Sequence, residues 1–271
     1  IGGMTMQNDQ AQFIKMTETP VHKLITSLAI PTIIIMLVTA IYNIADTFFV
    51  AKLGTSASGA VGIVFSLMAI IQAIGFTLGM GSGSLISRLL GAKKNEKANE
   101  MASTGFFTAI IFGVLLALFG IINLDALMKA LGSSDSILPL AKNYAKYILI
   151  AAPVMCASFV LNNILRSEGK ARFAMVGIAS GSIINIFLDP ILIFKFDMGI
   201  SGAAIATVIG QFSAAILAFI LFKRYNTHLH VSFKGLKIDF HVMSQLYSVA
   251  VPSTVMMCLP SVLVSLLNGM L

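Results

Sequence analysis

Long segments without a charged residue are the feature that most restricts the fold of this chain. A helix that crosses a lipid bilayer needs about 20 mostly apolar residues, and the sequence holds six complete segments of this kind and the start of a seventh. They are Leu24–Ala45 with an apolar continuation to Val50, Ala60–Leu85, Met101–Leu124, Tyr147–Leu165, Phe173–Phe194, Met198–Phe222 and Leu246–Leu271. The pattern predicts an all-α polytopic membrane protein.

The composition excludes the main alternative classes. Hydrophobic residues make up 57% of the chain and charged residues 11%, whereas soluble domains are about 45–50% apolar and about 25% charged. A soluble globular domain and a disordered chain are therefore excluded. The net charge of +7 lies in the loops between the spans, so we expect no nucleic-acid partner. The two cysteines lie in apolar segments, where neither a disulfide framework nor a metal cluster is expected.

The distribution of lysine and arginine predicts the orientation of the spans. With the N-terminus in the cytoplasm, 13 of the 18 cations fall on the cytoplasmic side, and the other five are Lys52, Lys129, Lys142, Lys146 and Lys195. Cytoplasmic loops of membrane proteins carry such an excess of positive charge. We therefore expect the N-terminus to be cytoplasmic.

A short repeat suggests that the chain contains part of a two-lobe protein. The segment Ser27–Thr32 (SLAIPT) resembles Ser248–Ser253 (SVAVPS), and each copy follows a basic segment and opens an apolar helix. Many transporters consist of two such halves. We expect a cytoplasmic segment over 1–23, a six-helix lobe over 24–224, a cytoplasmic linker over 225–245 and the first helix of a second six-helix lobe over 246–271. On this interpretation the chain is a fragment of a twelve-helix transporter; the alternative is a chance similarity of two apolar hexamers.

Two carboxylates interrupt the apolar segments, at Asp46 and Asp189. Charged side chains are costly in a membrane and usually functional there. Each aspartate lies six residues before a lysine at the outer end of its span, and Thr207 lies six residues after Ser201 in the next span, which runs inward. At 1.5 Å per residue these three side chains reach the same depth, about 9 Å from the outer ends. The alternatives are that Asp46 sits in the headgroup region and that Asp189 ends its helix at the Asp-Pro dipeptide.

Polar residues lie one helical turn from each of these three positions, where they share a face. They are Tyr42 and Asn43 beside Asp46, Asn185 beside Asp189, and Gln211 beside Thr207. Asn43, Gln211 and Gln72, which is near the middle of its span, are candidate cavity-lining residues; Gln72 could equally bond a neighbouring helix. Two carboxylates with such neighbours can bind a proton or Na⁺, and the sequence does not choose between these ions. We expect no resident metal and no cofactor.

Four motifs resemble the multidrug and toxic compound extrusion (MATE) family, and within it the MepA-like branch of bacteria. They are Tyr42–Val50 (YNIADTFFV), Ile86–Lys93 (ISRLLGAK), Asn185–Phe194 (NIFLDPILIF) and Gly202–Thr207 (GAAIAT), in the family's order. The resemblance implies a twelve-helix antiporter of the bacterial inner membrane, which exports cationic or amphipathic drugs in exchange for H⁺ or Na⁺ by alternating access. It further implies a cation-coupling site at Asp46, Asn185, Asp189 and Thr207, with Tyr42 nearby. We expect the protein to be monomeric.

Three other functions are weighed against this expectation. A flippase for a lipid-linked precursor would need a cationic cavity, whereas both charges predicted inside the membrane are acidic. An intramembrane enzyme would need a nucleophile or a metal set, but Cys156 has no histidine in its region and all four histidines lie in segments expected to be cytoplasmic. We therefore expect no enzyme activity. The third alternative is a truncated gene product without function.

Overall fold

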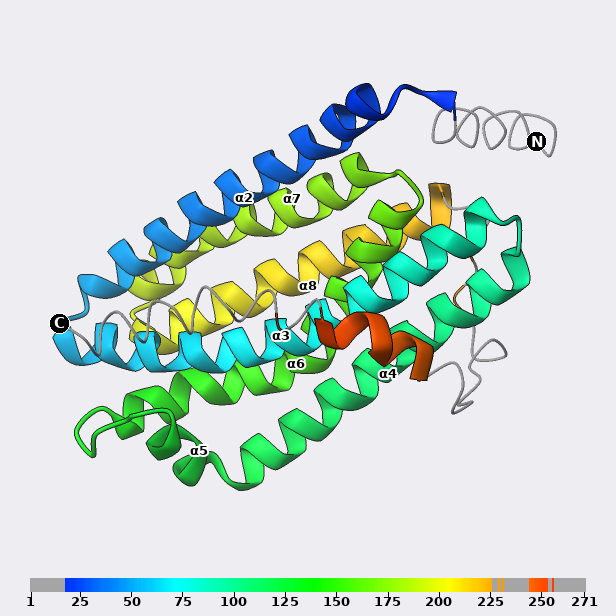
Figure 1. Ribbon diagram of the computed structural model, residues 1–271. Coiled ribbons are helices and arrows are strands. Elements are labelled where there is room, and N and C mark those ends of the chain that lie inside the picture. The colour runs from blue at the N-terminus through cyan, green and yellow to red at the C-terminus, as the bar shows by residue number, and fades with distance from the viewer. Residues whose placement is uncertain (1–17, 226–228, 230, 232–243, 253–254, 256–271) are drawn as a thin grey trace, which may run out of the picture.

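The computed structural model describes residues 18–225, 229, 231, 244–252 and 255. Within these residues the chain is helical and contains no strand. The elements form one bundle (Figure 1) and are α2 (Val21–Ala51), α3 (Thr55–Gly91), α4 (Asn95–Ile122), α5 (Leu124–Ala130), α6 (Leu138–Ser167), α7 (Ala171–Pro190), the π-helix η1 (Ile191–Lys195) and α8 (Gly199–Tyr225). Six helices, with α7 and η1 counted as one, are long and apolar enough to cross a membrane.

The six spans predicted from the sequence are confirmed, and most helices extend beyond the apolar segments. The largest difference is at α6, which begins at Leu138 instead of Tyr147, because its first turns are amphipathic and still helical. The predicted segment 1–23 is described only from residue 18, and most of the linker 225–245 and of the segment 246–271 lies outside the described residues. Residues 244–252 are helical, and Leu246 and Ala250 are fully buried.

Helix α6 forms the centre of the bundle and α2 lies at its edge. α6 packs against α3, α4 and α8, and it is the most buried of the six spans. α2 is the least buried span and packs mainly on α7, along which it runs in Figure 1. The apolar side chains that α2 exposes away from the cavity, such as Leu37 and Ile44, are those expected to face lipid or other protein.

Small residues bring the backbones of α7 and α8 into direct contact. A Cβ atom placed on Gly181 of α7 would lie 2.5 Å from the carbonyl oxygen of Gly210 and 2.7 Å from the Cβ of Ala214, both on α8. Membrane helices associate closely through such small residues, because apolar burial alone does not drive them together in lipid. The contact fixes α7 relative to α8 within one turn of Asn185 and Thr207.

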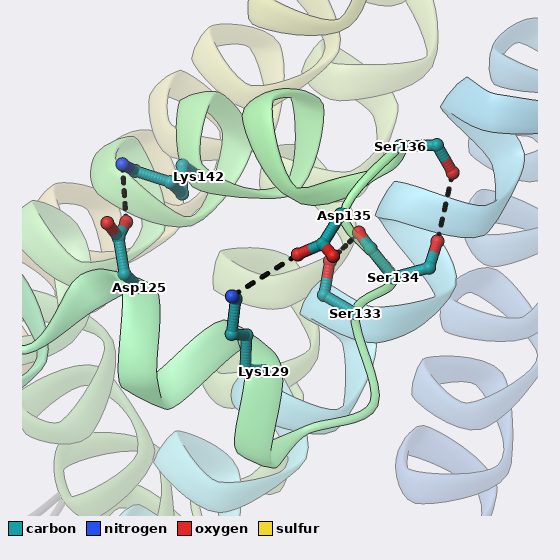
Figure 2. A network of polar contacts seen from close by, with 7 residues as sticks. All are labelled: Asp125, Lys129, Ser133, Ser134, Asp135, Ser136 and Lys142. Atoms are coloured by element: carbon teal, nitrogen blue, oxygen red, sulfur yellow. Dashed lines mark hydrogen bonds and ion pairs between the residues drawn. The ribbon is translucent and has the colours of Figure 1, made fainter.

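The C-terminal end of α4 is joined to α6 by the short helix α5, which was not predicted. Figure 2 shows the polar contacts around it: Lys142 pairs with Asp125, and Lys129 pairs with Asp135 at 3.2 Å. The hydroxyl groups of Ser134 and Ser136 are 3.0 Å apart. These side chains are largely exposed, so each ion pair contributes at most about 1 kcal/mol to stability. The network holds α5 against the start of α6, and it is exposed, whereas the polar groups inside the bundle are buried.

The C-terminal end of α7 changes to a π-helix at the Asp-Pro dipeptide. Pro190 cannot donate a backbone hydrogen bond, and the chain continues through η1, where the amide of Phe196 donates to the carbonyl of Ile191 at 3.0 Å. The alternative in which Asp189 ends the span is therefore wrong. π-Helical turns occur mostly as single insertions and often at functional sites, and this one directly follows a buried carboxylate.

Candidate functional site

Asp46 and Asp189 are both fully buried, with no accessible surface. α2 continues beyond Asp46 to Ala51, so the helix does not end near Ala45, as the alternative that places Asp46 in the headgroup region requires. The packing of α2 on α7 brings the two carboxyl groups close enough to interact electrostatically. The two aspartates are therefore neighbours across the contact of α2 and α7, and their common depth in a membrane stays a prediction.

A hydrogen-bonded group of neutral side chains adjoins the two carboxylates. The amide of Asn185 donates to the hydroxyl of Thr207 at 3.3 Å, and the hydroxyl groups of Tyr144 and Thr207 are also 3.3 Å apart. Tyr42 lies within electrostatic range of both carboxyl groups. All of these side chains are buried. Helices α2, α6, α7 and α8 therefore meet at one polar cluster inside an apolar bundle.

Five oxygen atoms in this cluster have no hydrogen-bond donor among the described residues. They are both carboxyl oxygens of Asp46, both of Asp189 and the amide oxygen of Asn185. Buried polar groups in folded proteins are nearly always paired, because an unpaired one costs about 1–3 kcal/mol or more. Oxygen ligands suit hard cations and protons. The described residues contain no group of three or more His, Cys, Asp or Glu side chains that could hold a metal ion.

A cavity of about 870 Å³ lies beside the cluster. Its wall includes six of the predicted residues: Tyr42, Asn43, Gln72, Asn185, Thr207 and Gln211. Of the two interpretations of Gln72, the one in which it lines the cavity thus agrees with the structure. Asp46 and Asp189 do not line the cavity. They lie behind its wall, and Tyr42, Asn185 and Thr207 stand at the boundary because they belong both to the cluster and to the wall.

Sequence reasoning missed Tyr144 and the inner part of the cavity wall. Tyr144 lies between two lysines in the amphipathic beginning of α6, before the predicted span Tyr147–Leu165. The inner wall of α6 consists of Ser158, Phe159, Asn162, Asn163 and Arg166. The spacing of three and four residues could have identified this set as one helical face.

Comparison with known proteins identifies the family of the chain. The sequence profile of the MatE family matches residues 31–191, a range that covers α3 to α7 and most of α2. The chain belongs to the MatE family.

Relatives and solved structures place the chain within MATE transporters. It is 30% identical to the multidrug export protein MepA of Staphylococcus aureus over 93% of the chain and 55% of that protein. It is similar to a crystal structure of MATE in the straight conformation, with a TM-score of 0.84 and 32% identity over 91% of the chain and 55% of that structure. A third similar structure is a MOP superfamily transporter from Pyrococcus furiosus, whose description reads "reverse polarity of binding pocket suggests different function". Its TM-score is 0.79 at 32% identity, over 86% of the chain and 52% of that structure.

This MatE chain spans about half the length of the relatives it matches. The MepA-like assignment made from the motifs is confirmed by the similarity to several staphylococcal MepA proteins, which include that of Staphylococcus haemolyticus at 30% identity. The chain is thus a MATE-type membrane protein that corresponds to part of its relatives' length.

Proposed function

We propose that the protein encoded by the complete gene is a secondary active antiporter, which exports amphipathic or cationic compounds in exchange for H⁺ or Na⁺. The observation that carries the proposal is the set of five buried, unpaired oxygens on Asp46, Asn185 and Asp189 beside a cavity. A proton or Na⁺ would satisfy these oxygens and neutralise charge that is otherwise costly in the membrane. On this proposal the N-terminus is cytoplasmic, the membrane is the bacterial inner membrane and the protein is monomeric.

Alternating access links the ion to the exported compound. With the cavity open to the outside, the ion binds at the carboxylates and allows α2, α7 and α8 to pack in a second arrangement. Tyr42, Asn185 and Thr207 belong to both the cluster and the cavity wall, so the rearrangement changes the surface that the compound contacts. Ion binding then weakens compound binding, and by linkage the compound weakens ion binding by the same factor.

Transport in proteoliposomes tests the proposal. Protein from the complete gene is reconstituted, and efflux of a fluorescent organic cation is followed after a pH gradient or, separately, a Na⁺ gradient is imposed. We expect one gradient to drive efflux and Asp189→Asn to abolish it. Asp125→Asn, which removes an exposed carboxylate of the outer network, is the matched control and keeps transport.

Two results would contradict the scheme. Absence of efflux under both gradients would exclude drug-ion antiport. A purified protein that neither releases protons nor loses bound Na⁺ when the compound is added would exclude the linkage, even if the compound binds.

One observation favours the flippase alternative. The flippase function is therefore tested beside the antiporter function. The two acidic residues that argue against a flippase do not line the cavity, and among the described residues the charged side chain that lines it is Arg166. A flippase would move a fluorescent lipid-linked phosphate between the leaflets of the same vesicles, with neither ion gradient required. Transport of that lipid without efflux of the organic cation would replace the antiporter proposal.

A further inference from the structure

Arg166 is the one charged side chain among the described residues that line the cavity. It lies in the last turn of α6, one and two turns beyond the cavity-lining residues Asn162 and Ser158. Positions four residues apart share a helical face, so these three side chains form a polar column that points into the same space. The column ends in a cation.

The charge of Arg166 has no counter-ion in the described part of the chain. Its Nε atom is buried without a hydrogen-bond partner, and no carboxylate of the described residues forms an ion pair with it. Glu168, the nearest acid in the sequence, pairs with Lys170 at 3.2 Å. A guanidinium group is a planar fork of donors that matches carboxylate and phosphate oxygens. The end of the cavity at Arg166 thus offers hydrogen-bond donors to an anion, and the described residues there supply no anion of their own.

Apolar and aromatic surface lies next to this cation. The rings of Phe76 on α3 and Phe159 on α6 both line the cavity, with centroids 4.7 Å apart. Phe159 precedes Arg166 by seven residues, or about 10 Å along the helix axis. A molecule with an aromatic body and an anionic group on one side spans this separation. Small-molecule sites typically combine such an apolar lining with a few placed polar groups.

We propose that Arg166 is a substrate-binding residue and that the cavity accepts amphipathic molecules that carry an anionic oxygen group, either a carboxylate or a phosphate. This inference rests on the proposed transport function and specifies the substrate class of the same cavity. It narrows the expectation of cationic or amphipathic substrates, because the carboxylates that would attract a cation lie behind the wall. Zwitterionic compounds, with an anion for Arg166 and a cation elsewhere, satisfy both requirements.

Binding of a matched pair of dyes tests the inference. Protein from the complete gene is titrated with a rhodamine that has a free carboxyl group and with its methyl ester, and fluorescence polarisation gives the affinities. A single-chain alkyl phosphate is then used as a competitor against the ester. Arg166→Gln removes the charge with little change in volume. Arg88→Gln is the matched control, because Arg88 also lies in the last turn of a helix, is exposed and does not line the cavity.

We expect Arg166→Gln to weaken binding of the carboxyl dye or of the alkyl phosphate by about ten-fold or more, since hydrogen bonds to charged groups are worth that much, and to leave the ester unchanged. The anion that loses affinity identifies the ligand as a carboxylate or a phosphate. Equal losses for anions and ester, or no loss for any of them, would overturn the inference and leave Arg166 a structural residue at the membrane interface. If the wild-type protein binds the ester but neither anion, only this inference fails; if it binds none of the three, the proposed function fails with it.

Discussion

The contact between Gly181 and α8 allows a prediction whose magnitude follows from the structure. In Gly181→Ala the new Cβ atom would lie 2.5 Å from the carbonyl oxygen of Gly210, which is 0.9 Å short of the 3.4 Å at which ordinary contact begins. The opposing atom belongs to the backbone, so α7 and α8 must separate by roughly that amount. Asn185 lies one turn from Gly181, and its hydrogen bond to Thr207, now 3.3 Å, would exceed the usual hydrogen-bond limit.

Three energies decide the sign of this effect. Overpacking costs about 1–3 kcal/mol and the lost hydrogen bond about 0.5–1.5 kcal/mol, whereas alanine gains up to about 1 kcal/mol over glycine in a helix. We expect a net loss of about 1–3 kcal/mol and weaker ion release on addition of the transported compound. Gly177→Ala is the control one turn away, because its Cβ would meet the nearest atoms of α8 at 3.5 Å. Gly177→Ala keeps the gain in helix propensity and lacks the steric clash with α8.

Thermal unfolding of the purified protein in a single detergent measures the difference. The reasoning predicts that Gly181→Ala melts below the wild type and that Gly177→Ala melts at or above it. If the two variants melt at the same temperature, the backbone contact does not position α7. If Gly181→Ala is destabilised but releases ions as the wild type does, the contact is structural and does not support the cluster.

Two further substitutions probe the packing around the cluster. Tyr144→Phe removes the hydroxyl that pairs with Thr207 at 3.3 Å and should cost about 0.5–1.5 kcal/mol of stability; an equal cost in a Thr207→Val background, measured by unfolding, would show that the two hydroxyls are not coupled. Gly113→Ala would place a Cβ atom 2.5 Å from the Cα of Pro153 on α6 and should lower stability by about 1–3 kcal/mol. Gly62→Ala, with nothing within 4 Å, serves as its control, and similar melting of both variants would contradict the close contact of α4 and α6.

The spans and the depth of the carboxylates could be predicted from the sequence because each depends on local quantities. Span length follows from bilayer thickness and the rise of a helix, and the depth of Asp46 and Asp189 follows from their distance to a lysine at the outer end. Apolar runs mark where a helix is buried in lipid, however, and not where it begins. For this reason the start of α6 was placed nine residues too late, and Tyr144 was left out of the site.

Lateral relations between helices were beyond reach of a single sequence. Helical periodicity shows which residues share a face but not which face meets which neighbour, so it cannot place the aspartates behind the cavity wall rather than in it. The same limitation hid Arg166, which was counted among the cytoplasmic cations because it ends a span. The side chain lies in the cavity wall because α6 is the central helix and its inner turns have no lipid to face.

The position of the carboxylates behind the wall has a consequence for the efficiency of exchange. If the ion and the compound occupied one volume, either would exclude the other absolutely and every cycle would be tightly coupled. Here the two volumes are separated by Tyr42, Asn185 and Thr207, so on the proposed mechanism the antagonism is finite, typically about 1–3 kcal/mol between distinct sites. A small fraction of the protein molecules then binds the ion and the compound at the same time. Such a carrier slips: it dissipates part of the ion gradient without export, and its measured stoichiometry falls below a whole number and varies with the compound.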